Sequence, residues 1–180
     1  LNNDLNVTYN KAINSDFTST SMIGYQIQYN RNQYTAQDGR DLAPFGTTVS
    51  AANNLFRRSV QSIAERFISG AFAQQTFGYK DEIFVTLAGR LDKSSVFATD
   101  NQNNFYPKIS GSWVFTDYVK GASFISSAKI RAAFGQAGNL TGIGAYDRFD
   151  NYNLSSNGGL VSITPSTTFA NPSVRPEKLT

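Results

Sequence analysis

The chain has 180 residues, of which 40% are hydrophobic and 16% are charged, with 14 Gly, 14 Phe, 9 Tyr, no Cys and no His. This length suits about one domain. Without Cys or His, disulfide scaffolds, Ser-His-Asp and Cys-His catalysis and the commonest zinc sites are excluded. The net charge of +3 comes from Lys and Arg residues that form no run. We therefore expect no cofactor, no metal and no nucleic-acid partner.

The apolar stretches are too short for a membrane-spanning helix. The run at 83–89 falls far below the roughly 20 apolar residues that such a helix needs. The mean hydropathy of -0.33 is also what the alternating strands of an outer-membrane barrel produce. The hydropathy is therefore compatible with both a membrane barrel and a soluble sheet.

Alternating polarity predicts four strands in the first half of the chain, at about 3–12, 16–34, 64–79 and 82–92. The segment 23–30 reads Ile-Gly-Tyr-Gln-Ile-Gln-Tyr-Asn, which places apolar residues on one face of a strand and mostly polar residues on the other. In the third strand the apolar parity switches between Phe72 and Phe77, which indicates a bulge or a mixed face.

The second half continues the same pattern. Two strands are predicted at about 105–116 and 127–137, and a seventh begins near Glu177. Ile109 and Trp113 share one face of the first of these strands. The whole chain is therefore predicted to be all-β.

Short and long connections alternate between these strands. The connections at 12–15 and 79–82 are tight and the one at 117–126 is moderate, whereas long polar loops occupy about 35–63, 93–104 and 138–176. In an antiparallel sheet this alternation gathers all long loops at one end. Outer-membrane barrels are built in this way, so the pattern favours an up-and-down transmembrane β-barrel segment over a soluble sandwich.

Aromatic residues gather near the end of the sheet that carries the short connections. They are Phe77, Tyr79, Trp113, Phe115 and Tyr118. They suit an aromatic girdle at a membrane interface, and equally the ordinary core of a soluble sheet.

Strand parity sorts the candidate functional residues onto two faces. The candidates for facing lipid are Ile83, Val85, Leu87, Ile109, Trp113, Ile130 and Phe134. The candidates for facing the lumen are Arg90, Asp92, Lys108, Lys129 and Arg131. A cation on the lipid face near mid-membrane costs about 2 to 4 kcal/mol, so a barrel requires these charges to point inward. They form either a structural ladder of ion pairs or a polar wall for a passing solute or a packed plug.

No pattern predicts catalysis. The adjacent carboxylates Asp81 and Glu82 point to opposite faces of a strand and suit a solvated turn. The glycine-rich stretch 135–144 lacks the Gly-Lys-Ser/Thr ending of a phosphate-binding loop. We expect the protein not to be an enzyme.

Four motifs in matching order resemble the SusC/RagA-type TonB-dependent outer-membrane transporters of the Bacteroidetes. An Arg-x-Asp-x-Ser-Ser loop is matched by Arg90, Asp92, Ser94 and Ser95, with Lys93 where Gly is usual. A Tyr-Pro-x-x-Ser-x-x-Trp strand is matched by Tyr106, Pro107, Ser110 and Trp113. A Lys-x-Arg-x-x-x-Gly-x-x-Gly-Asn element is matched by Lys129, Arg131, Gly135, Gly138 and Asn139. An Asn-Pro-x-x-x-x-Glu-Lys segment is matched by Asn171, Pro172, Glu177 and Lys178.

The resemblance implies a barrel of about 22 strands, of which this chain supplies about six to seven. It also implies an N-terminal plug, a segment that contacts TonB, and a SusD-like surface lipoprotein that acts as a lid. We expect residues 1–180 to be an interior barrel piece without plug or TonB box, placed in the lipid of a bacterial outer membrane. The family motifs are mostly structural, so no solute-binding residue is carried over.

The implied function is import of nutrients such as oligosaccharides or peptides, with TonB and the lipoprotein as partners. The alternative is a soluble or surface-attached β-rich binding or adhesion protein, in which the same alternation would bury one face in a sandwich core. The two differ in what lies against the apolar face.

Overall fold

The computed structural model describes residues 1–119, 126–167 and 169–180. Over these ranges the chain forms strands and short 3₁₀ turns, and no helix there has the length and apolar composition needed to cross a membrane. The chain forms two compact units, residues 1–29 with 67–180, and residues 30–66.

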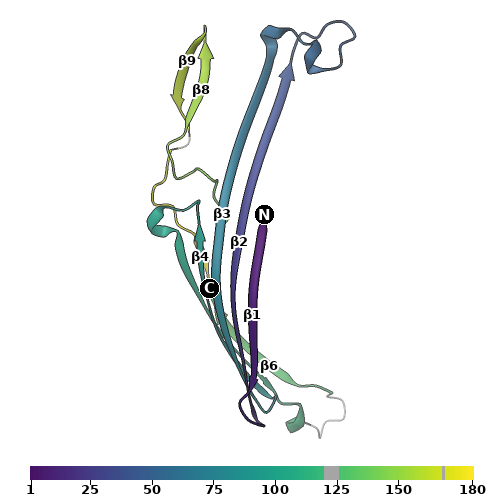
Figure 1. Cartoon of the computed structure of the whole chain (residues 1–180), viewed down its shortest axis with the longest axis vertical. Coiled ribbons are helices and arrows are strands. Elements are labelled where there is room, and N and C mark those ends of the chain that lie inside the picture. The colour runs from purple at the N-terminus through teal and green to yellow at the C-terminus, as the bar shows by residue number, and fades with distance from the viewer. Residues whose placement is uncertain (120–125, 168) are drawn as a thin grey trace. The chain divides into compact units, whose positions relative to one another are not determined.

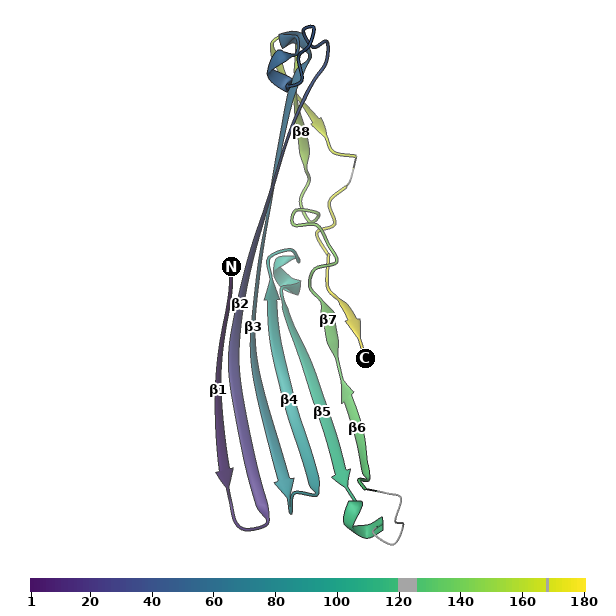
Figure 2. The ribbon, with the colours of Figure 1, turned by 90° about the vertical axis from the view of Figure 1, so that its right-hand side faces the viewer.

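The main sheet has six antiparallel strands whose spatial order is their order in the sequence. They are β1 (Asn2–Ala12), β2 (Phe17–Gly39), β3 (Arg57–Tyr79), β4 (Ile83–Ser94), β5 (Asn103–Val114) and β6 (Lys129–Gly135). Figures 1 and 2 show them side by side, with the connections after β1, β3 and β5 at one end of the sheet. This topology confirms the predicted all-β, up-and-down arrangement.

The parity switch in β3 is a mixed face and not a bulge. β3 pairs with β4 residue by residue, from Ile68 opposite Ser94 to Tyr79 opposite Ile83, without an extra residue. Phe72 therefore lies on the face that carries Arg90, its partner in the register.

Two tight turns between strands are explained by the residues within them. In the β1–β2 turn, the Asn14 Oδ1 atom accepts hydrogen bonds from the backbone N–H groups of Asp16 (2.9 Å) and Phe17 (2.8 Å), an Asx-type arrangement. In the β3–β4 turn, Lys80 and Asp81 both have positive φ (50° and 55°), as a type I′ hairpin turn requires. The carboxylates expected to belong to a solvated turn at this point do so.

The connection between β4 and β5 contains the most deeply buried apolar residues that the structure describes. Val96 and Phe97 are fully buried and pack with Val174, Leu140 and Ile143. We call these five residues the loop core. Backbone hydrogen bonds hold the same segments together, such as the one from Ala98 N–H to the Val174 carbonyl (3.3 Å). The connection is shorter than the polar loop predicted at 93–104, because β4 runs to Ser94 and β5 starts at Asn103.

The C-terminal segment departs from the single long loop expected at 138–176. It contains the strands β7 (Ala137–Asn139), β8 (Tyr152–Asn157), β9 (Leu160–Pro165) and β10 (Glu177–Leu179), with the pairs β8–β9 and β7–β10. The turn between β8 and β9 places Gly158 and Gly159 at positive φ (59° and 83°), which glycine tolerates. A strand at Glu177 was predicted, whereas the hairpin was not.

The second unit contains the outer parts of β2 and β3 and the loop between them. The strands run to Gly39 and from Arg57, so the loop expected at about 35–63 is only 40–56. It holds the 3₁₀ turns η1 (Val49–Ala51) and η2 (Asn54–Phe56), around the buried Ala52. The Arg57 Nε atom donates a hydrogen bond to the Ala52 carbonyl (3.0 Å).

Two further 3₁₀ turns flank β5. The turn η3 (Thr99–Asn101) precedes β5, and η4 (Thr116–Val119) follows it. The moderate connection expected at 117–126 lies partly outside the described residues.

Candidate functional site: two opposite faces of the sheet

The register brings the seven candidates for facing lipid onto one face of the sheet. Residues directly opposite each other in an antiparallel pair project to the same side. The pairs are Ile83 with Trp113, Val85 with Gly111, Leu87 with Ile109, Trp113 with Ile130, and Ile109 with Phe134. All seven are between 40% and 60% exposed. We call this surface the apolar face.

The apolar face continues across the first two strands. There the register pairs Leu5 with Tyr25 and Val7 with Ile23, and all four side chains are at least 46% exposed. Sequence parity had placed these residues on one face of each strand but did not define their partners. The apolar face therefore extends over strands well separated in the sequence.

The five candidate charged residues lie on the opposite face, which we call the polar face. The register pairs Arg90 with Tyr106, Asp92 with Asn104, Lys108 with Ala88, Arg131 with Ser112 and Lys129 with Val114. All of these positions have the strand parity opposite to that of Leu87 and Ile109. The structure thus brings the five residues to one surface, in a row across β4, β5 and β6.

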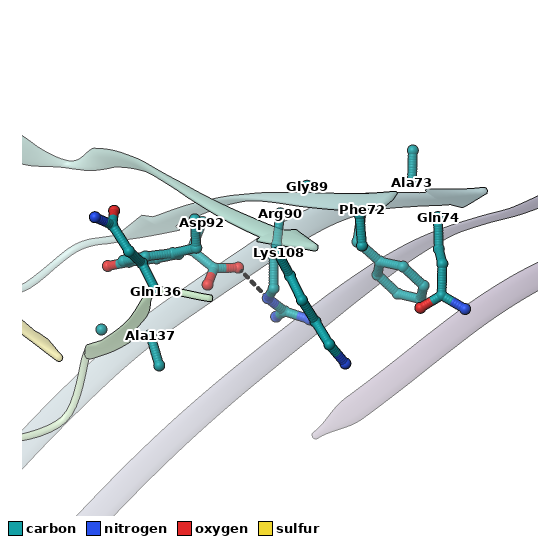
Figure 3. A pocket seen from close by; sticks show the side chains of 12 residues that line it. Phe72, Ala73, Gln74, Gly89, Arg90, Asp92, Lys108, Gln136 and Ala137 are labelled. Atoms are coloured by element: carbon teal, nitrogen blue, oxygen red, sulfur yellow. Dashed lines mark hydrogen bonds and ion pairs between the residues drawn. The ribbon is translucent and has the colours of Figure 1, made fainter. Parts of the chain in front are cut away.

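Arg90 and Asp92 form the central ion pair of the polar face. The Arg90 Nε atom donates to Asp92 Oδ1 at 2.6 Å, and its Nη2 atom donates to Gln26 Oε1 on β2 at 2.8 Å. The guanidinium lies 6.0 Å from the centre of the Phe72 ring. Asp92 is only 5% exposed, so the ion pair compensates a buried carboxylate. Figure 3 shows the pair, with Lys108 extending beside it.

Two adjacent hollows lie on the polar face and share Lys108. The first has a volume of about 450 Å³ and is lined by Phe72, Gln74, Arg90, Asp92, Tyr106, Lys108 and Gln136, among others (Figure 3). The second, of about 460 Å³, is lined by Lys108, Arg131 and the hydroxyl residues Thr86, Ser110 and Ser112, among others. Both hollows lie on the polar face, and their polar side chains can bind polar groups of a ligand.

Tyr106 and Gly138 form a contact that sequence reasoning did not find. Tyr106 is 5% exposed, and a Cβ atom on Gly138 would overlap its phenol ring. Lys178 of β10 lies over the same ring, with Nζ 5.9 Å from its centre. Tyr106, Gly138 and Lys178 each belong to a different one of the four family motifs. In the sequence, only the order of these motifs pointed to the contact.

The aromatic residues at the short-turn end contact one another. The Trp113 ring lies 5.3 Å from Phe115 and 6.0 Å from Tyr118, and Phe17 lies 4.6 Å from Tyr79. In the adjoining turn, a hydrogen bond with the Tyr79 side chain, then the charges of Tyr79 and Asp16, raise the pKa of Lys80. The end of the sheet therefore carries a band of aromatic rings beside a stable cation.

The two faces of the sheet together define a class of protein. Strands with a continuous exposed apolar face and a charged, hollowed opposite face suit a barrel wall between an apolar phase and a polar interior. In the part of the chain that the structure describes, no three His, Cys, Asp or Glu side chains gather as metal ligands would.

The comparisons identify the family. The sequence model of a protein family, TonB dependent receptor-like β-barrel, matches residues 1–180, so the chain belongs to this family. In Formosa agariphila, TonB-dependent receptor P26 is 30% identical over 148 residues, covering 77% of this chain and 14% of that protein. TonB-dependent receptor P39 of the same organism is 26% identical over 151 residues, covering 81% of this chain and 14% of that protein.

Solved structures share the fold. The RagAB peptide transporter has a TM-score of 0.81 at 17% identity, covering 98% of this chain and 20% of that chain. The open-open state of the RagAB peptide importer has a TM-score of 0.80 at 17% identity and the same coverage. The resemblance to SusC/RagA-type proteins is thereby confirmed, and family membership implies the outer membrane of a Gram-negative bacterium. The chain spans 14% of the length of both curated relatives.

Proposed function

We propose that the chain forms part of the barrel wall of a TonB-energised importer of oligosaccharides, peptides or similar nutrients. The observation that carries the proposal is the division of the same strands into an exposed apolar face and a polar face with a buried ion pair. The relatives named TonB-dependent receptors, and the matched structures described as peptide transporters, support it. In this proposal the chain lines the path along which a solute passes and carries out no covalent chemistry.

The assignment of the two faces follows from the cost of charge in lipid. The apolar face, including Val85 and Leu87, would meet the lipid of the outer membrane. Arg90, Asp92, Lys108, Lys129 and Arg131 would face the lumen, since a cation at the bilayer midplane costs about 2 to 4 kcal/mol. A SusD-like lipoprotein would close the outer side, and TonB would act through a part of the polypeptide outside residues 1–180.

The long connections would lie on the cell surface and the tight turns in the periplasm. We expect single cysteines at Thr47 and Ser156 to react with a membrane-impermeant thiol reagent on intact cells. A cysteine at Lys80 should react only after the outer membrane is opened. The reverse pattern would contradict the orientation.

Import itself is tested by deleting the intact gene and measuring uptake of labelled oligosaccharides and labelled peptides. We expect the deletion to abolish uptake of one nutrient class, and loss of TonB to do the same. Complementation with the intact gene should restore uptake. Unchanged uptake of every nutrient in both strains would contradict the proposal.

A further inference from the structure

A third hollow lies on the apolar face, across β2, β3, β4 and β5, and has a volume of about 370 Å³. Its lining combines the large apolar side chains of Ile23, Leu87 and Phe105 with the small residues Ala73 and Gly89. The Phe105 ring lies across Gly89, where a Cβ atom would come within 2.9 Å of the ring. We call this space the apolar-face hollow. Its apolar lining suits a hydrocarbon chain.

A cluster of polar side chains borders one end of this hollow. Gln75 is paired with Leu87, so its amide lies on the side of the apolar face. The Ser21 hydroxyl donates to Gln75 Oε1 at 2.5 Å, and Gln75 Nε2 donates to the Ser19 oxygen at 2.8 Å. Among the described residues, the Ser19 hydroxyl has no acceptor for its own proton. Since an unsatisfied polar group is costly in hydrocarbon, Ser19 has a hydrogen bond to donate to a group outside the chain.

A cation extends the polar end of the hollow. Lys11 is paired directly with Ser19, and its side chain is exposed. No carboxylate oxygen lies within 4.0 Å of its ammonium group in the described ranges. A lysine in this position can lay its methylene stem along an apolar surface and extend its charge to the membrane interface. The unbalanced charge beside a free hydroxyl donor therefore suits an anionic group that also carries an acceptor oxygen.

The depth of these groups in the sheet follows the order of groups in a phospholipid. The Phe17 and Tyr79 rings, 4.6 Å apart, stand at the short-turn end, where an aromatic girdle marks the membrane interface. Ser19 lies about 7 Å further in along β2 at the usual strand rise, and Ile23 about 13 Å beyond Ser19. A cation, a hydroxyl and an apolar hollow thus follow one another inward, as do the phosphate, ester carbonyl and acyl chain of a phospholipid.

We propose that the apolar-face hollow binds one phospholipid of the membrane leaflet that surrounds the short-turn end. The Lys11 ammonium group pairs with the phosphate, and the Ser19 hydroxyl donates a hydrogen bond to an ester carbonyl. One acyl chain fills the hollow between Ile23, Leu87 and Phe105. This inference rests on the proposed function, which places the apolar face in lipid and the tight turns in the periplasm.

The test is photolabelling of the full-length protein in proteoliposomes that contain phosphatidylglycerol with a diazirine on one acyl chain. We expect peptide mapping to find label at 73–75 and 87–89, and excess unlabelled dioleoyl phosphatidylglycerol to displace it. Dioleoylglycerol has the same chains without the phosphate, so it should compete about fivefold less well. In K11Q the two lipids should compete equally. K80Q is the matched control, because Lys80 lies in the neighbouring β3–β4 turn, and it should keep the preference for phosphatidylglycerol.

A second pair of variants tests the hollow itself. A73F fills it and should abolish the displaceable label, whereas V85F adds the same ring to the apolar face outside the hollow and should retain the label. Migration as unheated barrel on gels checks that each variant has folded, and K11Q decides if A73F has not.

Label that unlabelled lipid does not displace would overturn the phospholipid site. Equal label in folded A73F and V85F, or an unchanged preference for phosphatidylglycerol in K11Q, would also overturn it. Each of these results would leave the importer function intact. The absence of label from the whole apolar face would contradict both the site and the lipid-facing assignment on which it rests.

Discussion

The loop core and the apolar face differ in how far their apolar side chains are buried. Phe97 lies in a connection between strands and is fully buried, whereas Leu87 lies mid-strand and is 46% exposed. The loop core finds its packing partners within the chain, from segments more than 70 residues apart in the sequence, such as Val96 and Val174. Among the described residues, the seven side chains that define the apolar face stay between 40% and 60% exposed. One region is therefore stabilised from within, and the other depends on what surrounds the protein.

The largest effect is expected from emptying the loop core. F97A removes a fully buried ring, and such substitutions cost about 3 to 5 kcal/mol. Because the core joins loop segments, the loss should appear as faster hydrogen exchange at 95–102 and 140–150 in the full-length protein, with β4 unchanged. F45A is the matched control, since Phe45 is fully exposed, and it should change exchange by little. Equal exchange in the two variants would contradict an internally packed loop core.

A charge on the apolar face should cost somewhat less. L87R places a cation in the middle of β4, where a bilayer would impose about 2 to 4 kcal/mol. We expect less folded protein in the outer membrane, measured as the fraction that migrates as unheated barrel on gels. The conservative L87I variant should fold normally. If L87R assembled as well as L87I, the apolar face would not meet lipid.

A smaller effect is expected where β7 approaches β5. G138A would force a methyl group into the buried Tyr106 ring, and overpacking of this kind costs about 1 to 3 kcal/mol. G135A is the control, because its Cβ atom would lie 3.4 Å from the Lys108 Cβ, an ordinary contact. The unfolding temperature of the purified full-length protein should fall for G138A only. A fall of the same size in both variants would contradict the close approach.

The sequence predicted the strands well because period two survives wherever one face is apolar. It missed the outer parts of β2 and β3, where residues such as Gln37, Asp38 and Arg58 are polar on both faces and leave no alternation. It also missed the β8–β9 hairpin, although the Asn-Gly-Gly turn at 157–159 is a hairpin signal.

The two faces of the candidate site followed from parity, but its contacts did not. The hydrogen bond from Arg90 to Gln26 joins residues 64 positions apart. The Tyr106–Gly138 contact joins β5 of the main sheet to β7, which belongs to the separate pair with β10. The loop core was hidden for a related reason. Val96 and Phe97 stand within a polar stretch, and only the fold brings Val174 to them.

The central claim is that opposite faces of one strand meet different surroundings, and four positions of β4 test it directly. Fluorophores are attached to single cysteines at Val85 and Leu87 on the apolar face, and at Thr86 and Ala88 on the polar face, in the full-length protein in bilayers. A quencher carried on lipid chains should reduce emission at the first two positions and not at the others. Equal quenching at all four positions, or none at Val85 and Leu87, would contradict the account.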